Sequence, residues 1–167
     1  MERINKVKYG DFFSPCFLSK ITDKEPHQRT ERYNRAMSLA QIKQDILLNI
    51  RMILNSKSRA SNAEFGGDKA VLSSVLCFGL YDFCGENKSD VSMERIKDGI
   101  VEQLVYFEPR LAPLSIQVKI SDNNEELKYI CELEISGVIS VEGVSDEILL
   151  KSSLDLETGA VWVDFAE

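Results

Sequence analysis

The sequence contains a single histidine, His27, among its 167 residues. A Ser-His-Asp or Cys-His catalytic arrangement requires a histidine base that the fold holds in place. His27 instead lies in a charged run, K-E-P-H-Q-R-T-E-R-Y-N-R, which has no apolar face to bury. Neither G-x-x-x-x-G-K-[ST] nor G-x-G-x-x-G occurs either. The usual signatures of a histidine-dependent hydrolase and of a nucleotide-binding enzyme are therefore missing, and we expect no catalytic residues and no cofactor.

Cysteines are few, and none has the C-x-x-C spacing of redox or zinc motifs. A zinc site built from Cys77, Cys84 and His27 matches no common ligand spacing, so we expect no metal and four reduced thiols. The sequence also lacks a signal-peptide core and any run of the roughly 20 apolar residues that span a bilayer. These absences predict a cytoplasmic protein that does not insert into membranes.

Basic residues form no block. The 20 Lys and Arg are interspersed among 27 Asp and Glu, which gives a net charge of −7. A protein that binds nucleic acid or an anionic membrane surface concentrates positive charge, so neither partner is expected. The apolar content of 44% is enough for one sizeable core.

The chain divides into an N-terminal arm and linker, residues 1–37, and a single domain, residues 38–167. The arm carries a short apolar patch, F-F-S-P-C-F-L-S-K-I, ahead of the charged run. This patch either packs on its own domain or inserts into a neighbouring molecule.

Two amphipathic helices are predicted in the first part of the domain. One begins at Ser38, where S-L-A-Q forms a capping box, and runs to about Asn55. The other begins near Asp90 or Ser92 and ends before Pro109, because proline donates no N–H and disfavours a helical residue before it. Each has apolar residues three or four apart, namely Leu39, Ile42, Ile46, Ile50 and Ile53 in the first and Met93, Ile96, Ile100, Leu104 and Phe107 in the second.

The segment between the helices, K-A-V-L-S-S-V-L-C-F-G-L-Y-D-F, predicts one or two helical turns up to about Cys77. Gly79 is expected in a left-handed conformation after them. Asp82 is expected to accept hydrogen bonds from backbone N–H groups, with a direct role in binding as the alternative.

Beyond residue 115 the apolar period changes from 3.6 to 2, which is typical of strands with one buried face. The alternating residues are Ile116, Val118 and Ile120, and then Leu127, Tyr129, Cys131, Leu133 and Ile135. Residues 138–142 extend the second strand past Gly137, and residues 148–165 form a closing hairpin with Gly159 in a left-handed position. Helices followed by antiparallel strands predict an α+β fold with two layers, in which two main helices pack on a largely antiparallel sheet.

The stretch Y-F-E-P-R-L places Glu108 and Arg110 on either side of the rigid Pro109. Glu108 as a general acid is disfavoured, because Arg110 stabilises its ionised form. The two charges either pair within their own domain, as a surface contact worth about 0 to 1 kcal/mol, or present a preorganised bend and a planar donor fork to a partner.

Three segments resemble the TssE proteins of bacterial type VI secretion systems, relatives of the small baseplate wedge protein of contractile-tailed phages that is often labelled lysozyme-like. They are S-V-L-C-F-G-L-Y-D-F (74–83), F-E-P-R-L (107–111) and L-D-L-E-T-G-A-V-W-V (154–163). The family usually reads S-V-L-N-Y-G-L-P-D in the first segment, whereas this chain has Cys77, Phe78 and Tyr81 at the Asn, Tyr and Pro positions.

The resemblance implies a structural component of the cytoplasmic baseplate that binds other wedge subunits and helps to initiate polymerisation of the contractile sheath, without a small-molecule substrate. It assigns partner docking to Glu108, Pro109 and Arg110, and a strand edge of the sheet to the sheath. The closing hairpin is our candidate for that edge, and Trp162 within it belongs either to the core or to the interface. A muramidase-like hydrolase and an adaptor outside any secretion machine are the alternatives.

Overall fold

The computed structural model describes residue 22 and residues 26–27, 38–58, 68–82, 93–121, 130–141 and 144–166. The chain forms two compact units, Met1–Ile46 and Leu47–Glu167. Apart from Thr22, Pro26 and His27, the predicted arm lies outside the described residues, and so do its apolar patch and Cys84.

The first predicted helix is present as α2, Leu39–Asn55. Its capping box forms as expected: the Ser38 N–H donates to the Gln41 side-chain oxygen at 2.8 Å, and the Gln41 N–H donates to the Ser38 hydroxyl at 3.3 Å. The apolar stripe is buried and is wider than predicted, comprising Ile42, Ile46, Leu47, Ile50, Ile53 and Leu54.

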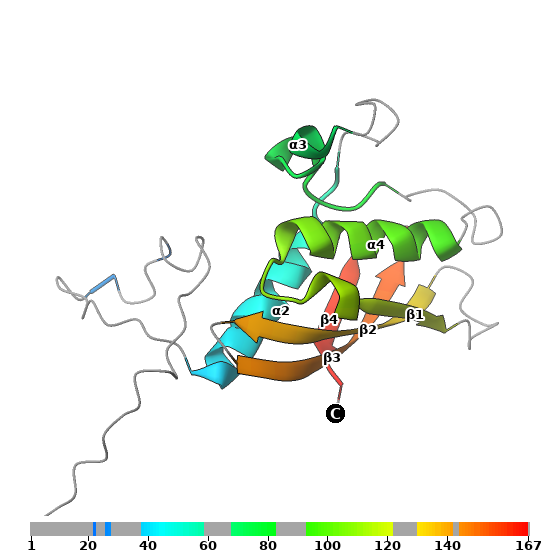
Figure 1. Ribbon diagram of the computed structural model, residues 1–167. Coiled ribbons are helices and arrows are strands. Elements are labelled where there is room, and N and C mark those ends of the chain that lie inside the picture. The colour runs from blue at the N-terminus through cyan, green and yellow to red at the C-terminus, as the bar shows by residue number, and fades with distance from the viewer. Residues whose placement is uncertain are drawn as a thin grey trace, which may run out of the picture. The chain divides into compact units, whose positions relative to one another are not determined.

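The strands after residue 116 form the antiparallel sheet that the period-two pattern predicted (Figure 1). Among the described residues, four strands follow one another in the order β1-β2-β3-β4: β1 Gln117–Ser121, β2 Ile130–Val141, β3 Val144–Asp155 and β4 Val161–Phe165. Strand β2 continues through Gly137 as expected, and it pairs with β3 along its whole length.

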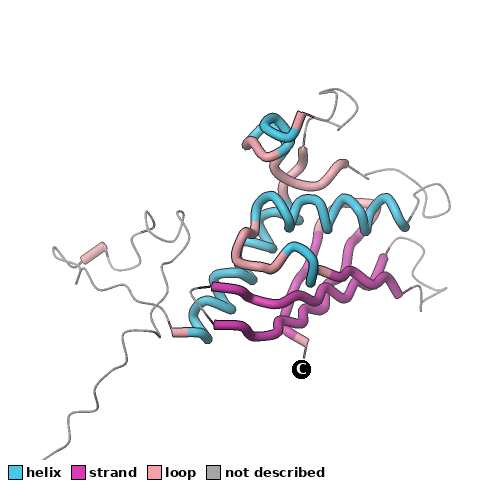
Figure 2. The backbone as a smooth tube through the Cα atoms, in the orientation of Figure 1, coloured by secondary structure: helices cyan, strands magenta, loops and turns pink. Residues whose placement is uncertain are grey.

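The second predicted helix is α4, Met93–Phe107, and it crosses one face of the sheet (Figures 1 and 2). Its residues Ile96, Ile100 and Leu104 are buried, as are inward side chains of the strands, among them Leu133, Ile135, Leu150 and Leu154. Helices in one layer and strands in the other confirm the α+β fold. The helix ends at Phe107, so Pro109 stops it where the sequence predicted.

Short helical turns, α3 Lys69–Leu72 and η1 Val75–Cys77, precede α4. After them the chain reverses at Gly79, whose φ of 108° confirms the predicted left-handed conformation. The buried Gln103 side chain of α4 fixes this reversal: it accepts from the Gly79 N–H at 2.8 Å and donates to the Cys77 carbonyl at 2.9 Å.

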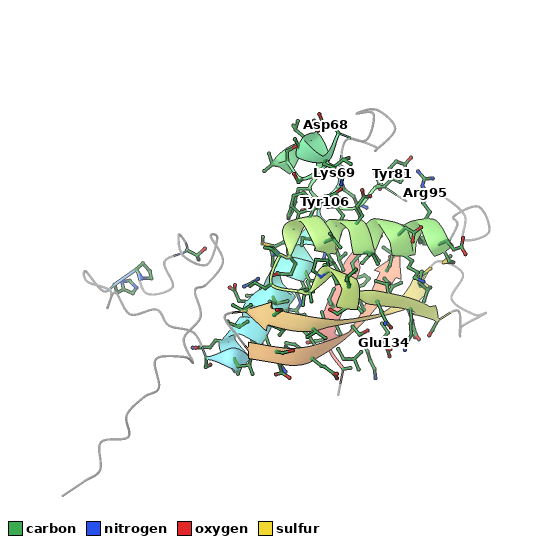
Figure 3. The ribbon with its side chains drawn as sticks, viewed as in Figure 1. Asp68, Lys69, Tyr81, Arg95, Tyr106 and Glu134 are labelled. Atoms are coloured by element: carbon green, nitrogen blue, oxygen red, sulfur yellow. The ribbon has the colours of Figure 1, made fainter. Side chains whose placement is uncertain are left out.

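Charged contacts follow the reversal. The Asp82 carboxylate, expected to accept from backbone N–H groups, lies 3.1 Å from the ammonium of Lys57. The ring of Tyr81 lies 4.5 Å from the guanidinium of Arg95 on α4 (Figure 3). Tyr81 therefore makes a cation–π contact with Arg95, at the position where the related family usually has proline.

The turn between β3 and β4 is held by Asp155. Its carboxylate accepts from the Thr158 hydroxyl and from the Glu157 N–H, both at 2.8 Å. These hydrogen bonds, the one from Thr158 first, lower the pKa of Asp155 below its usual value because they favour the ionised form. Gly159 has a φ of 68°, which confirms its predicted left-handed conformation.

Replacing Gly79 by alanine is expected to lower the free energy of unfolding by about 2 kcal/mol or more. A Cβ there lies 2.4 Å from the Ser56 carbonyl oxygen, on backbone that already has a positive φ. Gly99 in α4 is the matched control, because a Cβ at that position meets nothing within 4 Å and alanine favours helix by up to about 1 kcal/mol. Urea denaturation of both variants checks this: equal effects of Gly79→Ala and Gly99→Ala contradict the assignment.

Candidate functional site

The bend that follows α4 joins the helix to the sheet. The Glu108 N–H still donates to the Leu104 carbonyl at 2.9 Å, and the Leu111 N–H donates to the Glu108 carbonyl at 3.1 Å. Pro109 between them is exposed. The last turn of α4 thus passes directly into a tight turn, which proline restricts to few conformations.

Glu108 and Arg110 form a bidentate ion pair inside the protein. Arg110 Nε lies 2.6 Å from Glu108 Oε1, and Arg110 Nη2 donates to Oε2 at 2.7 Å. The Glu108 side chain is 0% exposed and that of Arg110 is 13% exposed. Of the two arrangements open from the sequence, the internal pair is therefore present, but it is buried, and treating it as a weak surface contact was wrong.

Asn49 of α2 completes the surroundings of the Glu108 carboxylate. Its side-chain Nδ2 donates to Glu108 Oε2 at 2.8 Å and to the Phe107 carbonyl at 3.0 Å. Asn49 was not predictable from the sequence, since it lies 59 positions from Glu108 and no local pattern links the two residues. Donors from both Arg110 and Asn49 thus reach one carboxylate, as expected for a buried charge.

The residues after Arg110 attach the bend to the edge of β2. The Arg110 carbonyl accepts from the Ser140 N–H at 2.8 Å, and the Ala112 N–H donates to the Val138 carbonyl at 2.8 Å. The Ser115 hydroxyl donates to the Ala112 carbonyl at 2.7 Å and accepts from the Val138 N–H at 2.8 Å. The bend and the start of β1 therefore have fixed positions on the sheet.

The outer surface of this region is apolar. Leu114, in the short η2 helix Pro113–Ser115, is 102% exposed. Pro109 and Pro113 are exposed near it in the chain. A fully exposed leucine on a segment held by so many hydrogen bonds presents an apolar contact that loses little conformational entropy on binding. Leu114 was not predicted as a site residue, because the A-P-L-S stretch has no periodicity.

This geometry is unsuited to glycan cleavage by Glu108. Its carboxylate has no exposed surface and already accepts from Arg110 and Asn49, so a glycosidic oxygen cannot reach it without unpacking the bend. Among the described residues, no group of three or more His, Cys, Asp or Glu is placed to hold a metal ion. Within the same ranges, none of the helices has the length and apolar content needed to cross a bilayer.

Comparison with known proteins gives one family. The family model described as "Baseplate wedge protein gp25" matches residues 40–144, which include α2 from its second residue, α4, the Glu108–Arg110 bend and the β1–β2 pair. No curated protein and no solved structure matches the chain.

Replacing Arg110 by alanine is expected to lower the free energy of unfolding by about 3 to 5 kcal/mol, because it leaves the Glu108 charge buried without its counterion. The double variant Glu108→Leu/Arg110→Met is expected to be more stable than Arg110→Ala. The control is Lys119→Ala: its pair with Glu134 has side chains 70% and 38% exposed, so its loss costs less than about 1 kcal/mol. Chemical denaturation decides, and an Arg110→Ala cost no larger than that of Lys119→Ala contradicts the buried pair.

Proposed function

The chain belongs to the baseplate wedge protein gp25 family. From this we infer that it is a wedge subunit of a contractile injection machine, and that it works in the cytoplasmic baseplate of a type VI secretion system. The family is described as a baseplate wedge protein, which supports a structural role in a baseplate for this chain. The likeness of residues 74–83, 107–111 and 154–163 to TssE proteins supports the secretion system over a phage tail. The subunit then acts by binding its neighbours.

The first docking surface in this proposal is the bend after α4. Pro109, Leu114 and the exposed rim of Arg110 contact other wedge subunits, while Glu108 acts from inside. The observation that supports it is the buried pair, which holds an apolar, proline-containing surface in one conformation. Arg110 then has two tasks, because the same guanidinium neutralises Glu108 and borders the surface.

Leu114→Asp tests this surface, since it adds a charge to a fully exposed side chain and removes no internal contact. In cells that carry the complete baseplate gene cluster, we expect it to weaken co-purification of wedge subunits by about tenfold or more. The matched control is Leu149→Asp, on the outward face of β3, where leucine is 43% exposed. Full recovery of every wedge component with Leu114→Asp removes this surface from the interface. Arg110→Ala is less informative, because lost binding and lost stability coincide in it.

The second docking surface is the free edge of β1. Val138 and Ser140 direct their main-chain groups toward the β1 side of β2, since these groups bond Ala112, Ser115 and Arg110. By the alternation of an antiparallel ladder, Gln117, Lys119 and Ser121 then bond to β2.

The N–H and C=O groups of Val118 and Ile120 consequently point away from the sheet. Within the described ranges, no residue hydrogen-bonds to them. Unpaired groups of this kind accept an additional strand, so they offer a sheath subunit a place to pair and to begin polymerisation.

The opposite edge is already occupied. On β4, Val161 exchanges two hydrogen bonds with the Asn55 side chain of α2, at 2.8 and 2.9 Å. The Val163 carbonyl accepts from Arg51 Nε at 2.7 Å. Strand β4 is thus an end strand of the sheet, as the closing hairpin suggested, but these contacts favour β1 over it as the site of strand addition.

Ile120→Pro tests the β1 edge. Proline removes the outward N–H, blocks a pairing strand and breaks no bond to β2. We expect this variant to bind wedge subunits but to support no sheath assembly, as seen by fluorescence microscopy of labelled sheath. Ile120→Ala loses a similar side-chain contact, keeps the N–H and should assemble sheath. Normal sheath with Ile120→Pro excludes strand addition at this edge.

A further inference from the structure

The face of the sheet turned away from α4 carries a hollow of about 720 Å³. Glu134, which Figure 3 shows on this face, contributes to its lining together with Arg51, Glu132, Lys151, Ser153 and Trp162. These strand residues alternate with the buried ones, so the hollow lies on the solvent side of the sheet.

Trp162 is 58% exposed in this hollow, although large aromatic side chains are usually mostly buried. The strand register places Trp162 opposite Ser153, and Ser153 opposite Glu132. Neighbouring strands lie about 4.8 Å apart, so the indole and the carboxylate come from backbone positions roughly 10 Å apart, with a small serine between them. The space over Ser153, between Trp162 and Glu132, is called the slot here.

Two of the carboxylates around the slot form ion pairs. Glu134 lies 3.3 Å from Lys119, and Asp164 lies 3.4 Å from Arg51. Lys151 stands in register between these two carboxylates.

Glu132, in contrast, stands between Ser121 and Ser153, and no described residue forms an ion pair or hydrogen bond with its side chain. Glu132 is therefore an exposed carboxylate without a described partner.

An exposed indole and an exposed carboxylate that line the same hollow match the chemistry of a guanidinium, which stacks on aromatic rings and donates in its plane to carboxylates. We propose that the slot binds an arginine side chain presented by a protein partner, with the guanidinium stacked on Trp162 and bonded to Glu132. The net charge of −7 favours approach of such a basic surface. Trp162 and Glu132 lie on β4 and β2, so the slot uses neither the bend nor the outward main-chain groups of β1. Its role does not rest on the proposed wedge function.

The single tryptophan of the chain makes the slot directly observable. Titration of the full-length protein with the peptide acetyl-Gly-Arg-Gly-amide, followed by the indole N–H signal in NMR, should give a saturable shift at millimolar concentration. The same peptide with citrulline, which keeps the shape and removes the charge, should bind about fivefold more weakly or worse.

Glu132→Gln should weaken binding of the arginine peptide about 2- to 5-fold. Its matched control is Glu147→Gln. Glu147 is another exposed carboxylate, on β3 and on the same face of the sheet as Glu132, and its neutralisation should leave binding unchanged. The proposal is overturned by a shift that does not saturate, by equal binding of the citrulline peptide, or by equal effects of the two Gln variants.

Discussion

The buried carboxylate of Glu108 is the interaction on which the arrangement around the bend depends. A charge without access to water is tolerated only when donors surround it, and here they come from Arg110 in the bend and Asn49 in α2. The Arg110 carbonyl in turn bonds Ser140 of β2. One carboxylate therefore ties the end of α4 to the second half of α2 and, through its partner's backbone, to the sheet.

The same reasoning about polar groups applies to the edges of the sheet. Along the outer side of β2, β1 covers residues 132–136 and the bend bonds residues 138 and 140. On β4, side chains of Asn55 and Arg51 take the place of a missing strand. Backbone N–H and C=O groups in strands need hydrogen-bond partners. Along the outer side of β2 and on β4, other residues of the chain supply them. The unpaired edge of β1 differs from these, which supports a role for it in binding a strand of another subunit.

The sequence predicted what is encoded locally. The capping box at Ser38, the stop at Pro109 and the positive φ of Gly79 and Gly159 each depend on a few adjacent residues, and they were placed correctly. The environment of Glu108 was not predictable in this way, because its burial depends on Asn49 in another helix. Trp162 was left between core and interface. The alternation of A-V-W-V-D-F matches its outward position, but only the register shows that Glu132 lies two strands away.

The distribution of charged and apolar groups then separates stability from binding. The acid–base pair that looked most like a binding site, Glu108 with Arg110, lies mostly inside, while Leu114, the β1 backbone and the indole of Trp162 face solvent. Contacts through a leucine and through main-chain groups respond weakly to ionic strength, whereas an arginine in the slot at Glu132 is screened by salt. High salt therefore separates these contributions: association through Leu114 or through the β1 backbone persists, whereas arginine binding in the slot weakens.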